Sequence, residues 1–195
     1  DGRPVVDVVD SGNVSCGEGL VVIAAAECAL SGGSAEEVVA AARRAADNTR
    51  AFALLASVDA AVKGGRVPPI VRTVSNALNL SIVLATQPDG QVKAGGALWG
   101  RHRLTERFAR MVARRAPALA AERRTGVTAP HDAVPRLRLL VAHGDAPEAG
   151  RELAEHLHRA LPDGSIERCE LTELGTAHGV HGGPGTLIVG IQAIR

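Results

Sequence analysis

Hydrophobic and polar positions along the chain follow two periods, one typical of strands and one typical of helices. Runs that are β-branched, alternating or fully apolar predict strands at 5–9, 51–58, 80–86, 91–97, 136–143, 165–171 and 186–194. Apolar residues at helical spacing predict helices at 19–30, 34–48, 70–78, 104–115 and 146–161. The helix at 19–30 is apolar almost throughout, so we expect it to be buried on most sides.

Capping and turn residues mark the ends of several of these elements. Ser34 and Glu37 have the spacing of a capping box, which predicts that a helix begins there. Asp89-Gly90 lies between two strands and is typical of a hairpin, whereas 125–135, with one glycine and two prolines, predicts a loop. Strands and helices alternate along most of the chain, with this one hairpin. The predicted fold class is therefore α/β, with a mixed sheet flanked by helices.

Composition and charge exclude several classes of function. The 195 residues are 46% hydrophobic but only 2% aromatic, and the net charge is +1. Balanced charge argues against non-specific nucleic-acid binding, and scarce aromatic residues argue against base stacking. No apolar run is long enough to span a membrane, and no leader pattern opens the chain, so we expect a cytoplasmic protein without integral membrane association. The odd number of widely spaced cysteines fits this compartment: Cys16, Cys28 and Cys169.

Two glycine clusters are the strongest candidates for chemistry. One is Gly64-Gly65-Arg66, and the other runs from His181 through Gly182, Gly183 and Pro184 to Gly185. Glycine lets backbone amides approach an anion closely, and an adjacent arginine or histidine would complete a carboxylate or phosphate site. Neither cluster follows a known nucleotide-binding pattern, so on spacing alone tight turns between elements are the favoured interpretation.

The histidines near the second cluster are candidate metal ligands. His178 and His181 lie three residues apart, with Cys169 upstream, but no zinc-binding spacing is legible. We therefore expect no metal and no cofactor.

Taken together, these motifs resemble the DegV family of bacterial fatty-acid-binding proteins. The resemblance rests on their order along the chain: Asp10-Ser11, the helix start Val14-Ser15-Cys16-Gly17-Glu18-Gly19, Lys63-Gly64-Gly65-Arg66, the strand 79–84 with its Asp89-Gly90 hairpin, Arg101, and His181 to Gly185. It covers about the last two thirds of the family. The motifs Thr-Ser-Gln-Pro-Ser and Ser-Gly-Thr-Tyr of the family's first α/β domain are absent.

The resemblance implies a division of the chain and a function. Residues 1–50 would be a remnant of the first α/β domain, and 51–195 would be the DegV-like C-terminal α/β domain. A chain that starts at Asp1 would then be a fragment. The family serves as the lipid-binding subunit of fatty acid kinase, so the partners would be a long-chain fatty acid and a nucleotide-binding kinase subunit. The chain would bind the acid in an apolar tunnel, would not itself be an enzyme, and would present the carboxylate for phosphorylation to an acyl phosphate.

The same resemblance assigns roles to individual residues. His181, with Gly183 and Gly185, would lie near the carboxyl or acyl-phosphate group. Arg66, with Gly65, and Arg101 would line the mouth or contact the kinase subunit. Two other classes remain open on the residues alone. One is a stand-alone enzyme that acts on a small phosphorylated or acyl substrate with His181 as acid and base, and the other is a regulatory or structural module.

Overall fold

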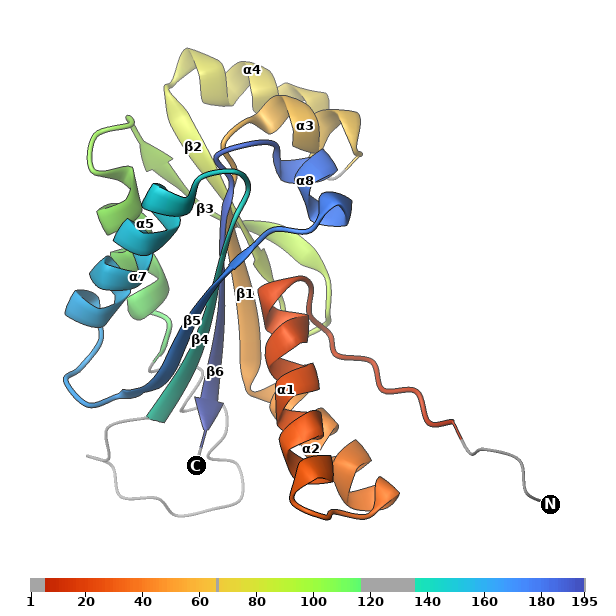
Figure 1. Cartoon of the computed structure of the whole chain (residues 1–195). Helices are drawn as coiled ribbons and strands as arrows, with labels where there is room; N and C mark the ends of the chain where they lie inside the picture. Colours follow the sequence, from red (N-terminus) through yellow and green to blue (C-terminus); the bar gives the residue numbers. More distant parts are fainter. Residues whose placement is uncertain (1–5, 66, 117–135, 195) are drawn as a thin grey trace.

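One six-stranded mixed sheet forms the centre of the molecule (Figure 1). The structure is a computed structural model that describes residues 6–65, 67–116 and 136–194. The strand order is β3-β2-β1-β6-β4-β5; β4 and β5 are parallel, and the other neighbouring pairs are antiparallel. The strands are β1 Thr49–Leu54, β2 Leu80–Thr86, β3 Val92–Trp99, β4 Arg136–His143, β5 Ile166–Glu173 and β6 Leu187–Ile194. This arrangement confirms the predicted α/β class with a mixed sheet.

Two amphipathic helices cover one face of the sheet. They are α5 (Leu104–Ala113) and α7 (Pro147–Ala160), which lie together on the same side in Figure 1. Phe108 of α5 and Leu153 of α7 are fully buried with alternate residues of β4 and β6. Apart from Phe52 and Phe108, the buried side chains of this main core are aliphatic, so it holds few of the aromatic anchors that are common in protein cores.

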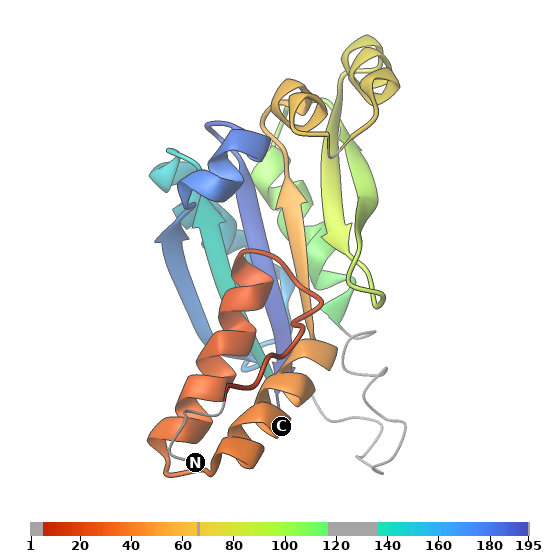
Figure 2. The same cartoon turned by 90° about the vertical axis from the view of Figure 1, so that its right-hand side faces the viewer.

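Helices at both ends cover the opposite face. They are α1 (Cys16–Leu30), α2 (Ala35–Asp47), α3 (Val58–Lys63), α4 (Pro69–Ala77) and α8 (Thr176–Gly182). The start of α1 packs directly on β6, where a Cβ added to Gly190 would lie 2.6 Å from the backbone carbonyl of Cys16. Figure 2 shows α1 and α2 at one end of this face and α3, α4 and α8 at the other. Between these groups the sheet carries no helix, and this gap positions the site described below.

Several predicted elements are confirmed at their predicted places. The capping box of α2 is complete, because the Ser34 hydroxyl accepts from the Glu37 amide and the Glu37 carboxylate accepts from the Ser34 amide. The hairpin of β2 and β3 turns at Gly90, which has a positive φ of 76°. Each of the helices predicted at 70–78, 104–115 and 146–161 is present within a few residues of its expected ends.

Three predictions about local structure are wrong. The described part of the predicted strand 5–9 is extended but unpaired, with Val8 87% exposed, because no strand of the sheet lies beside it. Helix α1 is buried along one side only, and Leu30 is 88% exposed. In addition, the predicted strand 51–58 ends at Leu54, and Val58 already begins α3.

Two further expectations concern the loop 125–135 and the division of the chain into domains. The predicted loop 125–135 lies outside the described residues. The division of the chain into 1–50 and 51–195 stays a prediction. Within the described ranges, no helix is both long and apolar enough to cross a membrane.

Candidate functional site

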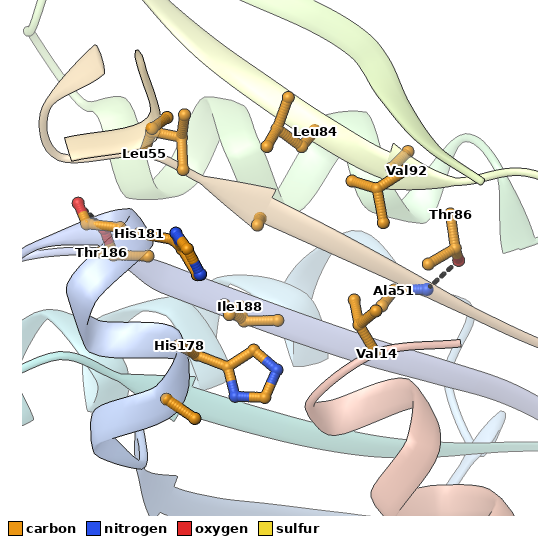
Figure 3. Close-up of a pocket in the computed structure, with 15 residues that line it drawn as sticks. Val14, Ala51, Leu55, Leu84, Thr86, Val92, His178, His181, Thr186 and Ile188 are labelled. Atoms are coloured by element: carbon orange, nitrogen blue, oxygen red, sulfur yellow. Dashed lines mark hydrogen bonds between the residues drawn. The ribbon is translucent and has the colours of Figure 1, made fainter. Parts of the chain in front are cut away.

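An apolar pocket of about 240 Å³ lies on the sheet face between α8, α3 and the segment that precedes α1 (Figure 3). Its floor is formed by β1, β2 and β6, whose outward residues on this face are small or aliphatic. Its lining residues are Val14, Ala51, Ala53, Leu55, Ala61, Leu84, Ala85, Thr86, Val92, Ala177, His178, His181, Gly182, Thr186 and Ile188. Ala51 and Leu55 lie four residues apart along β1, so the pocket follows this strand for about 13 Å.

His181 stands at the α3 end of the pocket. Its side chain is half-buried, and its Nδ1 atom is fully buried without a hydrogen-bond partner among the residues that the structure describes. A Cβ added to Gly64 would lie 2.2 Å from that Nδ1 atom, so only glycine leaves room for the imidazole there. The two glycine clusters, far apart in the sequence, therefore meet at one point. The Nδ1 side of the ring is closed off by Gly64, and the ring presents its other edge to the pocket.

The glycines that follow His181 shape the connection from α8 to β6. Gly183 and Gly185 have positive φ angles of 76° and 87°, a conformation that favours glycine. Their amides donate to the carbonyls of Gly179, at 2.8 Å, and Gly144, at 2.6 Å. Because both amides are occupied, these glycines act on the site by fixing the course of the backbone. Direct contact of either glycine with a ligand stays a prediction.

Thr186 completes this connection. Its hydroxyl donates to the carbonyl of Gly182 at 2.6 Å and accepts from the amide of Ala56 at 3.2 Å. These two bonds join the end of α8 to the segment between β1 and α3. The end of α8, which carries His181, is thus tied to the segment that leads into α3.

A second histidine, His178, also lines the pocket, although the sequence pattern did not single it out as a binding residue. His178 lies one helical turn before His181 on α8, and both rings face the pocket (Figure 3). The signal is a spacing of three residues, which becomes informative only once 176–182 is known to be helical. No group of three histidine, cysteine or acidic residues that could hold a metal is found in the described ranges.

The Thr86 hydroxyl closes the opposite end of the pocket, and it already takes part in two hydrogen bonds. The amide of Ala51 donates to Thr86 Oγ1 at 2.9 Å, and Thr86 Oγ1 donates to Asn13 Oδ1 at 3.2 Å. The two ends of the pocket therefore differ in chemistry. The α3 end has an imidazole nitrogen without a partner among the described residues, whereas at the Thr86 end the hydroxyl already donates its hydrogen to Asn13.

The remaining predicted site residues lie away from the pocket or outside the described structure. Gly65 has a positive φ of 70° and is exposed beside Gly64, and it does not line the pocket. Arg101 follows β3 at the sheet end that carries α4; it is exposed and does not line the pocket either. Arg66 lies outside the described residues. Cys16, near the pocket, is buried, and burial raises the pKa of its thiol to about 11, which disfavours the nucleophilic thiolate.

Comparison with known proteins matches nearly the whole chain to one family. Residues 3–194 match the family model described as "Uncharacterised protein, DegV family". A DegV domain-containing protein of Streptomyces coelicolor is 30% identical over 188 residues, which cover 96% of this chain and 60% of that protein.

Solved structures show the same fold. A DegV family protein from Thermus thermophilus, described in terms of fatty acid binding, is 27% identical with a TM-score of 0.75, and the match covers 99% of this chain and 62% of that one. A DegV family protein from Corynebacterium glutamicum is 22% identical with a TM-score of 0.74, covering 97% and 64%. The chain thus spans about three fifths of the length of these relatives. On the match over residues 3–194, the chain belongs to the DegV family.

Proposed function

We propose that this chain binds a long-chain fatty acid, with the acyl chain along β1 and the carboxylate at His181. The observation that carries the proposal is the asymmetry of the pocket, which has small aliphatic walls and the imidazole of His181 at its α3 end. Each buried methylene contributes roughly 0.8 kcal/mol, so aliphatic walls hold an acyl chain without specific contacts. The imidazole of His181 packs its Nδ1 side against Gly64, so we expect its Nε2–H to donate a charge-assisted hydrogen bond to the carboxylate.

The size of the pocket indicates that it takes part of the ligand. Its volume of about 240 Å³ lies below the range of about 300–1,000 Å³ that is typical of complete ligand sites. We expect the remaining surface of the ligand to be covered by parts of the full-length protein beyond these residues, so the 195 residues alone would bind fatty acids weakly. Fatty acid binding by the relative from Thermus thermophilus supports the ligand class.

The finer part of the proposal concerns what happens to the bound acid. A separate nucleotide-binding kinase subunit transfers the terminal phosphoryl group of a nucleoside triphosphate to a carboxylate oxygen, which forms an acyl phosphate and releases the nucleoside diphosphate. The chain itself holds and orients the acid. Arg101 is exposed at the sheet end that carries α3 and α4, and we assign it to contact with the kinase subunit.

Stand-alone catalysis by His181 has less support. A histidine that acts as acid and base is usually oriented by a carboxylate or another polar group. No acidic residue lines the pocket in the described part of the chain, and Nδ1 of His181 has no partner there. The same two facts favour a site that receives an anion from outside.

Mass spectrometry of lipids extracted from the purified full-length protein tests the proposal. We expect a co-purified long-chain fatty acid, and we expect added palmitate to bind. The His181→Ala variant should bind palmitate more weakly and should lose acyl phosphate formation with the kinase subunit more completely than it loses binding. Acyl phosphate formation without any partner would favour the enzyme, and absence of both co-purified lipid and palmitate binding would rule out the proposal.

A further inference from the structure

We infer that His178 is a second binding group for the anionic head of the ligand, so that the carboxylate is held between two imidazoles of α8. The inference rests on the proposed function and adds a residue to its site. His178 and His181 lie three residues apart on one face of α8, with Cβ atoms about 5–6 Å apart in helical geometry. The two oxygens of one carboxylate can each accept a bond of about 2.7–2.9 Å from side chains at this spacing.

The orientation of α8 supports this arrangement. His178 and His181 both line the pocket, whereas Val180 is 67% exposed on the outward side of the same helix. The ring nitrogens of His178 make no hydrogen bond to any other residue that the structure describes. Both imidazoles are therefore directed at the same space, and both have donors to offer (Figure 3).

The composition of the lining favours a role for both imidazoles. Transfer of a carboxylate into an apolar site is costly unless its oxygens find partners. The described walls contributed by the segment before α1, by β1, β2, β3 and β6, and by α3 contain no titratable side chain; the two histidines of α8 are the titratable groups of the lining. Among the described side chains of the lining, these two rings are therefore the groups that can offer a carboxylate a charge-assisted hydrogen bond.

Dependence on the charge of the ligand is the consequence that distinguishes this site from a purely apolar one. A hydrogen bond between an imidazole and a carboxylate is charge-assisted and stronger than one between neutral groups. Removal of a head-group imidazole should therefore lower the affinity for the acid much more than the affinity for an uncharged analogue with the same chain.

The test compares palmitate with hexadecanol, which has the same chain and no charge, in the full-length protein. We expect His178→Phe to lower the affinity for palmitate about tenfold and to leave that for hexadecanol within about twofold, since a hydrogen bond to a charged group is lost while the wall stays apolar. His178→Gln keeps a donor and should retain part of the palmitate affinity. His158→Gln, an exposed histidine of α7 on the other sheet face, is the matched control.

The outcomes separate the inference from the proposed function. If His178→Phe weakens palmitate and hexadecanol equally, or neither, His178 does not bind the head group and the inference is overturned. If wild-type protein binds palmitate and His181→Ala loses it while the His178 variants bind palmitate as wild type does, only the inference fails. If the wild-type protein binds no palmitate, the proposed function fails and the inference with it.

Discussion

Gly64 and His181 occupy one site from opposite ends of the chain: a Cβ added to Gly64 would lie 2.2 Å from Nδ1 of His181. The backbone at Gly64 has φ −79°, which any residue adopts, so its glycine is required by space and not by conformation. Beside it, Gly65 has φ 70° and no neighbouring atom within 4 Å of an added Cβ. The adjacent glycines thus serve two different purposes.

This pair gives a matched test of the site. Gly64→Ala should displace the His181 ring and lower the affinity for palmitate about tenfold, because the charge-assisted hydrogen bond is lost. Gly65→Ala should leave affinity unchanged and cost about 1–2 kcal/mol of stability, because alanine is strained at positive φ. Palmitate titrations and urea unfolding of both variants measure the two effects. Equal affinity of Gly64→Ala and wild type would contradict the role of His181.

The Thr86 end of the pocket should limit the length of the acyl chain. Val92 lines this end from β3 and pairs with Thr86 across the hairpin. Val92→Phe adds bulk there, so we expect affinity to fall more for an 18-carbon acid than for a 12-carbon acid. Val180→Phe, on the outward side of α8, is the control. Affinities for a series of chain lengths would show the selectivity, and a uniform loss for all lengths would refute it.

The contact between β6 and α1 should be one of the places in the fold that tolerate substitution least. A Cβ added to Gly190 would lie 2.6 Å from the backbone carbonyl of Cys16, and backbone atoms cannot move aside as a side-chain tip can. Gly190→Ala should therefore cost about 1–3 kcal/mol, as overpacking does in other cores. Gly179→Ala, in α8 with open space around it, should instead stabilise by up to about 1 kcal/mol. Denaturant unfolding compares the two, and similar stabilities would show that α1 is not held against β6.

Thiol chemistry offers a test of burial that needs no ligand. Burial raises the pKa of the Cys16 thiol to about 11 from an ordinary 9.0, so near pH 8 it should carry about 100-fold less thiolate than an ordinary cysteine. We expect a thiol reagent to label Cys16 in the native protein far more slowly than after unfolding. Mass spectrometry of the labelled peptides measures this difference; rapid native labelling would mean that α1 opens readily.

The same group gives a pH dependence with a defined sign. Between about pH 9 and 11 the folded protein keeps the Cys16 proton that the unfolded chain releases, so this contribution to stability is complete below pH 9 and is lost as the pH rises to 11. Cys16→Ala should show a shallower loss of stability over this range than wild type. An identical slope in the two proteins would contradict the burial of Cys16.

Local patterns in the sequence predicted most elements, because their signals are local. The capping box at Ser34 and Glu37 and the hairpin at Gly90 depend on residues a few positions apart, and both are confirmed. The exposed side of α1 could not be predicted in the same way. An apolar helix is expected to be buried, but whether anything covers Leu30 depends on neighbouring segments that periodicity does not reveal.

The sequence predicted individual residues of the candidate site but not how the fold brings them together. Both glycine clusters and His181 stand out in the sequence, but the contact of Gly64 with His181 depends on the packing of α3 against α8. His178 gained significance only from the helical turn that places it beside His181. The helix could not be predicted from the sequence because glycines lie on both sides of that turn, and glycine disfavours helical structure by about 1 kcal/mol per residue.

A crystal structure of the full-length protein with palmitate tests the central claim most directly. We predict an acyl chain that lies along β1 between His181 and Thr86, with a carboxylate oxygen within hydrogen-bond distance of His181 Nε2. A palmitate whose carboxylate lies at the Thr86 end, or a pocket left empty at saturating palmitate, would contradict the account.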